Sequence, residues 1–180
     1  MWQNQRELSL RTTTSGLQLE PLRAAENART KMKNKPVKAK VDRDHPAFNK
    51  NAEAFYRIVM KGLKGEVDGE HFWDAVAKDA VFEFMYNIPG FTTRIEGRKA
   101  YMDWFGGYTN VLHSADNLRV HKSINPNITI LEYEVHGTVP STRKSYDNRF
   151  CSIITVKDRQ IIHWRDYMDS FAVMLSVSSE

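Results

Sequence analysis

The residues best suited to chemistry lie close to the C-terminal end of the chain. Asp166 stands between Trp164 and Met168 at two-residue spacing, so in a β-strand the three side chains share one face. If that face is enclosed, partial desolvation raises the pKa of the Asp166 carboxyl group and makes it a better general base near neutral pH. If the face is the open side of a sheet, Asp166 is simply solvated. Alternation alone leaves both arrangements open.

A second set of ionisable side chains lies in an earlier predicted strand. Alternation puts Glu134 and His136 together on one face of that strand, and in the strand after it Asn148 and Phe150 share a face. Glu134 and His136 could take part in proton transfer. They could equally pair with each other or with Arg149 in a structural network, since such networks also perturb pKa values.

The elements that must position these residues follow a simple order. Apolar residues recur at helical spacing after Asp44, a predicted helix cap, and Pro46, and the run ends at Gly62 and Gly65. The remaining predicted elements are helices at 70–77 and 98–112 and strands at 80–86, 117–124, 128–139, 145–156 and 161–169. Helices followed by long antiparallel strands predict an α+β architecture.

Composition excludes several classes of protein. The chain has 180 residues with 41% hydrophobic and 27% charged side chains, which is typical of a globular domain. Its sequence has no apolar run of the roughly 18 residues that span a bilayer and no signal peptide. The single cysteine, Cys151, excludes a disulfide framework and a thiolate-cage metal site, and a cytoplasmic location is expected. The sequence also lacks a glycine-rich phosphate loop and a nucleophile elbow, which disfavours nucleotide and serine hydrolase chemistry.

The basic charge of the chain belongs to its N-terminal part. Residues 1–46 contain ten Lys or Arg against five Asp or Glu, and their only aromatic residue is Trp2. We therefore predict a basic, disordered extension at 1–45 and one folded domain at 46–180. The cation-rich segment 29–40 lacks interleaved aromatic residues, so its composition favours a solvated tail over a nucleic-acid site.

The folded part resembles the superfamily of ketosteroid isomerase, nuclear transport factor 2 and the SnoaL-like polyketide cyclases. The matching stretches are Asp79-Ala-Val-Phe-Glu-Phe, Ile95-Glu-Gly-Arg-Lys-Ala-Tyr and Ile161-Ile-His-Trp-Arg-Asp-Tyr-Met-Asp. The last stretch and Lys144-Ser-Tyr are also similar to the limonene-epoxide hydrolases of this superfamily. The resemblance covers roughly residues 46–175, and it is more specific for the fold than for the reaction, because this fold hosts many reactions.

The resemblance implies a cone-shaped α+β barrel, in which N-terminal helices pack on a strongly curved antiparallel sheet around an apolar pocket. It places Asp166, Trp164 and Met168 inside that pocket. It also turns further residues inward as pocket or wall residues: Glu134, His136, Asn148, Phe150, Phe82, Phe84, Tyr101 and Tyr108. Relatives often pair through the sheet, so a homodimer is expected as well.

The catalytic residues of the named relatives carry over only in part. The last-strand aspartate of the epoxide hydrolases matches Asp166, but their arginine is lost, and the two positions that help to hold water fall on Phe82 and Phe84. The general base of ketosteroid isomerase falls near Phe84, which cannot take a proton, and its enolate-stabilising acid falls near Ser152. Tyr56 could correspond to the isomerase tyrosine. Neither known mechanism is reproduced.

We therefore predict a constellation in which Asp166, Glu134 and His136 exchange protons, with Tyr56 and Asn148 as hydrogen-bond donors. Two carboxylates in one dry pocket push one pKa upward, so that one can act as acid and the other as base. The expected activity is isomerisation, cyclisation or dehydration of a hydrophobic small molecule such as a steroid, terpenoid or polyketide, without a cofactor. Metal binding is not expected, because the six histidines are scattered. The alternatives are an epoxide hydrolase and a non-catalytic ligand-binding or assembly domain.

Overall fold

The computed structural model describes residues 41–178. Most of the predicted extension at 1–45, including its cation-rich segment, therefore lies outside the described residues. Residues 41–45 are described, and they pack against the residues that follow them. Val41 is buried, and the Arg43 guanidinium donates two hydrogen bonds to the carboxylate of Asp74, at 2.8 and 3.0 Å.

The centre of the domain is a mixed sheet of six strands in the order β2-β1-β6-β5-β4-β3. The strands are β1 (Val76–Phe84), β2 (Arg94–Glu96), β3 (Leu112–Lys122), β4 (Ile128–Thr138), β5 (Ser145–Lys157) and β6 (Gln160–Met168). The three long antiparallel strands β4, β5 and β6 follow the predicted segments closely. The short edge strand β2 was not predicted, because its three residues are too few to show a period.

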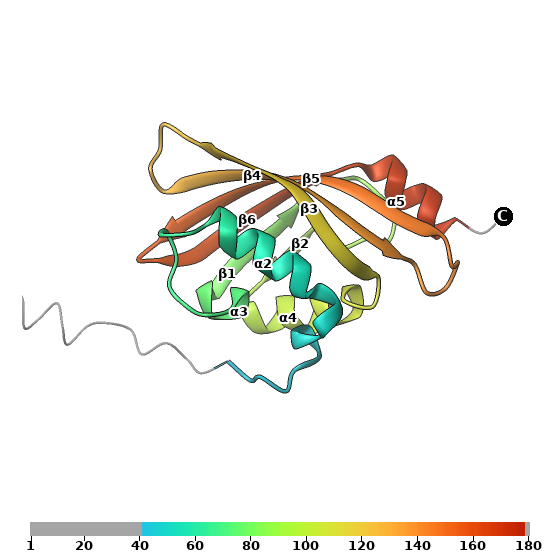
Figure 1. Cartoon of the computed structure of the whole chain (residues 1–180), viewed down its shortest axis with the longest axis horizontal. Coiled ribbons are helices and arrows are strands. Elements are labelled where there is room, and N and C mark those ends of the chain that lie inside the picture. The colour runs from blue at the N-terminus through green and yellow to red at the C-terminus, as the bar shows by residue number, and fades with distance from the viewer. Residues whose placement is uncertain (1–40, 179–180) are drawn as a thin grey trace, which may run out of the picture. The chain divides into compact units, whose positions relative to one another are not determined.

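The helices cover one face of this sheet (Figure 1). They are the 3₁₀ turns η1 (Pro46–Phe48) and η2 (Lys50–Ala52) and the helices α2 (Glu53–Gly62), α3 (Phe72–Ala75), α4 (Arg98–Tyr108) and α5 (Ser170–Val177). The predicted α+β class, with helices packed on a curved sheet, is confirmed. The sheet differs from the predicted cone-shaped barrel of antiparallel strands in two details. The sheet is open with β2 and β3 as its edges, and β1 runs parallel to β6.

Local capping explains where the helices differ from the predictions. The predicted cap Asp44 is replaced by His45, whose Nδ1 accepts from the Ala47 amide at 3.1 Å, and two 3₁₀ turns precede α2. The second helix is a single turn held by a capping box between His71 and Asp74, after which the chain extends into β1. The predicted helix at 98–112 ends at Tyr108.

Aromatic side chains fill the space between the helices and the sheet. The indole Nε1 of Trp73 donates to the carbonyl oxygen of Ala47 at 3.1 Å, and the hydroxyl of Tyr56 donates to the same oxygen. The Arg98 guanidinium on α4 donates to the carbonyl oxygen of Val76, the first residue of β1, at 3.1 Å. These bonds satisfy buried backbone groups and fix η1, α3 and α4 against one another.

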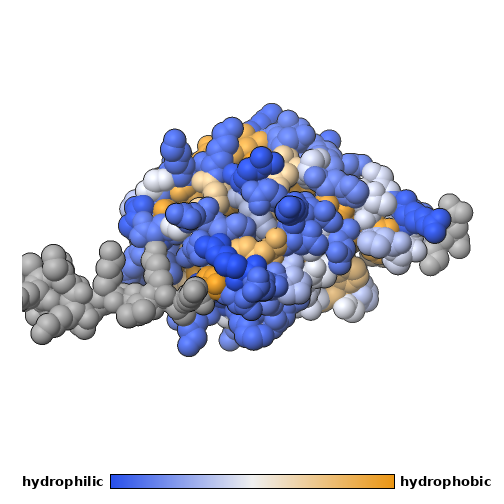
Figure 2. Space-filling model, turned by 60° about the horizontal axis from the view of Figure 1, so that its bottom comes forward, coloured by the Kyte–Doolittle hydropathy of each residue, from blue (hydrophilic) through white to orange (hydrophobic). Residues whose placement is uncertain are grey.

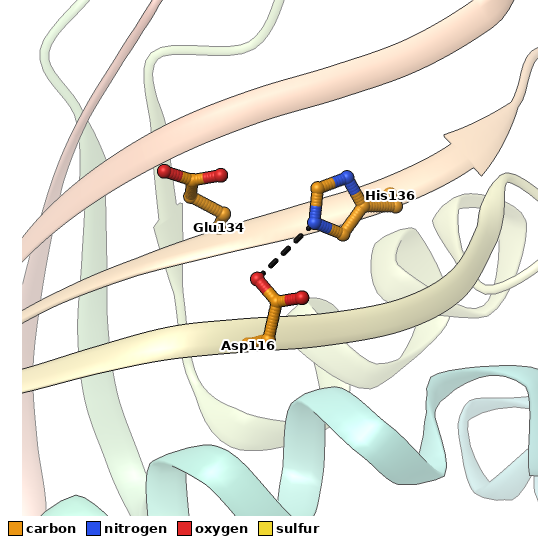
Figure 3. A group of neighbouring side chains, drawn as sticks. All are labelled: Asp116, Glu134 and His136. Atoms are coloured by element: carbon orange, nitrogen blue, oxygen red, sulfur yellow. Dashed lines mark hydrogen bonds and ion pairs between the residues drawn. The ribbon is translucent and has the colours of Figure 1, made fainter.

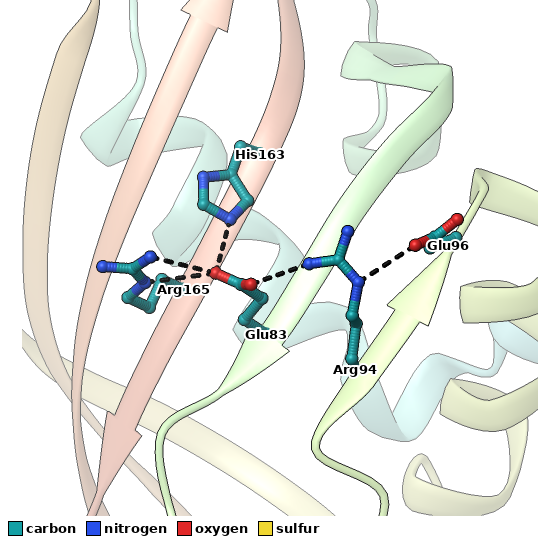
Figure 4. Close-up of polar contacts among 5 residues, drawn as sticks. All are labelled: Glu83, Arg94, Glu96, His163 and Arg165. Atoms are coloured by element: carbon teal, nitrogen blue, oxygen red, sulfur yellow. Dashed lines mark hydrogen bonds and ion pairs between the residues drawn. The ribbon is translucent and has the colours of Figure 1, made fainter.

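The opposite face of the sheet carries ion pairs. Glu83 on β1 accepts from Arg94 on β2 at 2.7 Å, and on β6 it contacts His163 at 2.8 Å and Arg165 at 3.1 Å (Figure 4). One carboxylate thereby links three neighbouring strands. The hydrogen bonds from His163 and Arg165 hold the pKa of Glu83 below its ordinary value. Each exposed pair is worth little alone, but the network favours one register of β2, β1 and β6.

The surface over α3 and α4 is mainly hydrophilic, with separate small hydrophobic areas (Figure 2). Within residues 41–178, the structure contains no helix that is both long enough and apolar enough to cross a membrane.

Gly137 on β4 is predicted to be essential for the close approach of β3 and β4. A Cβ at this position would lie 1.8 Å from the carbonyl oxygen of Val111, which is backbone and cannot swing away. We expect Gly137→Ala to lower the free energy of unfolding by about 2–3 kcal/mol, measured by urea denaturation. The control is Gly107→Ala, because a Cβ there meets nothing within 4 Å and alanine favours the helix by up to about 1 kcal/mol. Equal stability of the two variants would contradict this account.

Candidate active site

A cavity of about 180 Å³ lies between the helices and the inner face of the sheet. Its lining is dominated by aromatic side chains from α2, α4, the strands and the loop after β1: Phe55, Phe84, Tyr86, Phe91, Tyr101, Trp104, Phe105, Tyr108, Tyr133, Tyr146 and Phe150. Aliphatic residues and α5 complete the wall, and Asp166 supplies a carboxylate. A concave, largely apolar site with few polar groups is the usual form of a small-molecule pocket.

Asp166 reaches this cavity from β6 and is only 5% exposed. Its Oδ1 accepts a hydrogen bond from the indole Nε1 of Trp164 at 2.5 Å and another from the hydroxyl of Ser152. Ser152 lies directly opposite Asp166 on β5, and its hydroxyl also contacts the phenol of Tyr133 at 3.0 Å. Both donors therefore hold one and the same oxygen of the carboxylate.

The second oxygen, Oδ2, has no hydrogen-bond partner among residues 41–178. Within those residues, no fully buried side-chain oxygen or nitrogen lacks a partner. Oδ2 must therefore border open space, and the space beside Asp166 is the cavity. A carboxylate oxygen that is free on the ligand side and fixed on the protein side is well suited to accept a proton.

Burial sets the basicity of this group. Desolvation raises the pKa of Asp166 from 3.8 to about 6, although the hydrogen bonds from Ser152 and Trp164 act in the opposite direction. The carboxylate is therefore mostly ionised at neutral pH, yet it is much more basic than a solvated aspartate. This is the range in which a carboxylate works as a general base.

The phenols around Asp166 stay protonated at physiological pH. Burial raises the pKa of Tyr146 to about 12 and the pKa values of Tyr108 and Tyr133 well above 10. The hydroxyl of Tyr146 accepts from the hydroxyl of Tyr108 at 3.1 Å and from Nδ2 of Asn148 at 3.4 Å. Its own proton has no acceptor among the described residues, so Tyr146 can donate a hydrogen bond to a ligand in the cavity.

The structure places several predicted site residues in the cavity lining and others behind it. Asp166, Met168, Phe150, Phe84, Tyr101 and Tyr108 line the cavity. Trp164 lies behind Asp166 and positions it. Phe82 lies behind Tyr101, with ring centroids 3.6 Å apart. Asn148 holds Tyr146 from behind and is itself fixed by the Asp169 amide, which donates to its Oδ1 at 3.0 Å.

The prediction that Glu134 and His136 face the pocket is wrong. Both lie on the opposite face of the sheet, on β4, beside Asp116 of the edge strand β3 (Figure 3). The inward side of β4 is occupied by Tyr133 and Val135, because apolar side chains gain from burial whereas ionised ones lose. Alternation grouped the side chains correctly, but the resemblance turned the wrong group inward.

The outward residues form a charged network. The ring of His136 contacts Asp147 at 2.7 Å through Nδ1 and Asp116 at 3.2 Å through Nε2, which raises its pKa. Glu134 lies 3.5 Å from Arg149, the pairing that the sequence left as an alternative. One ligand atom each of Asp116, Glu134 and His136 lies within 4.8 Å of the others, but ion pairs already occupy all three side chains.

Tyr56 is also misplaced in the predicted constellation. It is buried, does not line the cavity, and donates to the Ala47 carbonyl oxygen, so it belongs to the core. Three residues that were not among the predicted site residues, Tyr146, Ser152 and Tyr133, lie at the cavity or contact Asp166 instead. The period-two pattern of β5 puts Tyr146 and Ser152 on the same face as Asn148, which is the signal that could have identified them.

The chain is similar to known proteins. The family model described as a SnoaL-like domain matches residues 52–164. The uncharacterised protein YesE of Bacillus subtilis (strain 168) is 30% identical over 129 residues, which is 70% of this chain and 86% of YesE.

Solved structures show the same fold. A Bacillus subtilis protein provisionally called an isomerase has a TM-score of 0.56 at 26% identity, over 76% of this chain and 95% of that one. A provisionally assigned SnoaL-like polyketide cyclase from Jannaschia sp. CCS1 has a TM-score of 0.51 at 17% identity, over 79% and 99%. At that lower identity the likeness shows the fold alone. The homodimer and the cytoplasmic location stay predictions.

The buried charge of Asp166 is predicted to cost stability above pH 6. The raised pKa means that the folded chain binds this proton more tightly than the unfolded chain, so the contribution of this group to stability is fully present below pH 3.8 and is lost as pH rises through about 6. Asp166→Asn removes the charge and keeps an oxygen acceptor. We expect it to raise the free energy of unfolding at pH 8 by up to about 3 kcal/mol and to change it little at pH 4.

Urea denaturation at both pH values measures this difference. Glu134→Gln is the control, because it makes the same carboxylate-to-amide change on the outward face of the sheet. A difference between Asp166→Asn and wild type that is the same at pH 4 and pH 8 would show that the carboxyl group does not carry the predicted pKa shift.

Proposed function

The chain belongs to the SnoaL-like domain family, and on this premise we propose that it is a cofactor-independent enzyme in which Asp166 acts as the general base. The proposed reactions are isomerisation, cyclisation or dehydration of a hydrophobic small molecule. The observation that carries the proposal is the free Oδ2 of a desolvated carboxylate in an aromatic cavity. A similar solved structure, at 26% identity, is provisionally called an isomerase, which supports the same reaction class.

The proposed chemistry begins with proton abstraction next to a carbonyl group. Oδ2 of Asp166 takes a proton from that carbon, and the electron pair moves into an enolate whose oxygen accepts a hydrogen bond from Tyr146. Return of the proton from Asp166 to another carbon completes an isomerisation. Attack of the enolate carbon on a second carbonyl forms a ring and an alkoxide, which takes the proton back from Asp166. In a dehydration, the β-hydroxyl takes this proton and leaves as water.

The positioning of both groups supports this proposal. Trp164 and Ser152 hold Oδ1, so the carboxylate cannot rotate its free oxygen away from the cavity without losing two hydrogen bonds. Tyr108 and Asn148 point their own donors at the Tyr146 oxygen, so its proton is directed elsewhere. Preorganised groups of this kind act on developing charge without having to reorganise during the reaction.

Turnover should depend on the ionised form of Asp166. We expect Asp166→Asn to lower kcat/KM by about 10²–10⁴-fold, the usual contribution of a general base. In wild type, kcat/KM should rise with pH through about 6, since the carboxylate is the reactive form. The assay uses a pool of β,γ-unsaturated ketosteroids and cyclic epoxides in ¹⁸O-labelled water, with mass spectrometry as the readout.

The same assay separates the alternatives. Rearrangement at constant mass that is lost in Asp166→Asn supports the proposal, whereas a gain of one labelled water indicates an epoxide hydrolase. Glu134→Gln is the matched control and should keep wild-type turnover, because its side chain lies on the other face of the sheet. Full turnover in Asp166→Asn would overturn the role of this residue.

Tyr146→Phe tests the proposed hydrogen-bond donor. Removal of one oxyanion donor typically costs about 10²–10³-fold in kcat, and we expect a loss of that order with little change in KM. The control is Tyr108→Phe, which also deletes one buried phenol but leaves the proton of Tyr146 in place. If the two variants lose the same amount of kcat, measured on any substrate that the pool identifies, Tyr146 is not the donor.

A further inference from the structure

The cavity has an unusual electrical character. Among the described residues that line it, Asp166 alone carries a formal charge, and none is Lys, Arg or His. The basic side chain nearest to it in sequence, Arg165, is directed to Glu83 on the outward face of the sheet. The rest of the wall consists largely of aromatic rings, whose faces carry negative potential. Both features favour a cation in the cavity and disfavour an anion.

The carboxylate itself lacks a counter-charge. Its two protein donors, Trp164 and Ser152, are neutral, and both bind Oδ1. Oδ2 borders the cavity without a donor from residues 41–178. A buried carboxylate is usually paired with a positive group, because its desolvation is otherwise uncompensated. None of the described residues supplies a positive group to Oδ2, so a ligand can supply it.

From this arrangement we infer that the cavity also binds aromatic or polycyclic amines, whose protonated nitrogen contacts Oδ2 of Asp166 while their rings lie against the aromatic wall. The inference goes beyond the proposed function, because it names a second class of ligand for the same cavity. An ammonium group at Oδ2 occupies the oxygen that acts as the proposed base, so a bound amine competes with a ketone substrate. A neutral steroid or terpenoid ketone offers no charge to Oδ2. An acidic polyketide would bring a second negative charge to it.

The wall is suited to a flat ring system. On the α4 side, Trp104 stacks with Tyr101 at an interplanar angle of 15° and with Tyr108 at 24°. On the sheet side, Tyr133 and Phe150 stack at 3°. The cavity volume of about 180 Å³ fits a ligand of about two fused rings. Aromatic side chains thus line the cavity on two sides.

The test compares three probes that differ only in charge: 1-naphthylmethylamine, 1-naphthalenemethanol and 1-naphthoate. Each is titrated into the full chain at pH 7.5 by isothermal titration calorimetry. We expect the amine to bind at least about tenfold more tightly than the alcohol and the carboxylate to bind least. The net charge of the chain is +4, so nonspecific attraction would favour the carboxylate and cannot produce this order.

The pH dependence identifies the partner of the amine. The titratable groups that surround Asp166 are Cys151 and five phenols, and burial raises the pKa of every one of them: Tyr86, Tyr101, Tyr108, Tyr133 and Tyr146. Asp166, with a pKa of about 6, is thus the group that changes charge between pH 5 and pH 7.5. Affinity for the amine should fall when the pH is lowered across that range, while affinity for the alcohol should not fall.

Variants complete the test. Asp166→Asn should lose the preference for the amine and keep binding of the alcohol, which also shows that the cavity is intact. Glu134→Gln should keep the preference. Equal binding of amine and alcohol by wild type, a preference that survives in Asp166→Asn, or no binding of any probe would each overturn the inference. Asp166-dependent turnover of a neutral ketone would then leave the proposed function standing on its own.

Discussion

The burial of one carboxylate is the constraint on which the rest of the site depends. Asp166 loses most of its hydration, and only two neutral donors on a single oxygen offset that loss. One donor, Trp164, comes from the same strand two residues earlier. The other, Ser152, comes from the neighbouring strand, directly opposite. A slip of one residue between β5 and β6 would turn Ser152 to the other face and leave the carboxylate with one donor. Register and basicity are therefore linked.

The aromatic wall has two roles that depend on the same physics. It excludes water from Asp166, which raises the carboxyl pKa, and it does so with phenols whose own burial keeps them protonated. The site therefore holds one strong acceptor and at least one neutral donor, Tyr146, at the same pH. A core optimised only for stability would not retain a buried charge here, since its desolvation opposes folding.

The sequence predicted those parts of the site that follow from alternation within one strand. It grouped Asp166 with Trp164 and it separated Glu134 and His136 from Tyr133 and Val135, because side chains in a strand alternate between faces. Which group faces inward is a tertiary property. The cross-strand contacts of Ser152 depend on strand register, which one sequence does not reveal. The same holds for the packing that puts Tyr146 in the cavity lining and Asn148 behind it. The family resemblance supplied the fold, and it also introduced the error at Glu134 and His136.

That error changes the mechanism in a definite way. Two carboxylates in one pocket would raise a pKa by mutual repulsion, and the proton would be shared between them. In the structure Glu134 is paired outside, at Arg149, so repulsion plays no part. Desolvation, partly offset by the two hydrogen bonds to Oδ1, sets the basicity of Asp166. A base tuned by desolvation is sensitive to what enters the cavity, because a ligand that displaces water raises its pKa further, whereas a cationic ligand lowers it again. The charge of the ligand, together with the protein, therefore decides whether Asp166 is ionised when it binds.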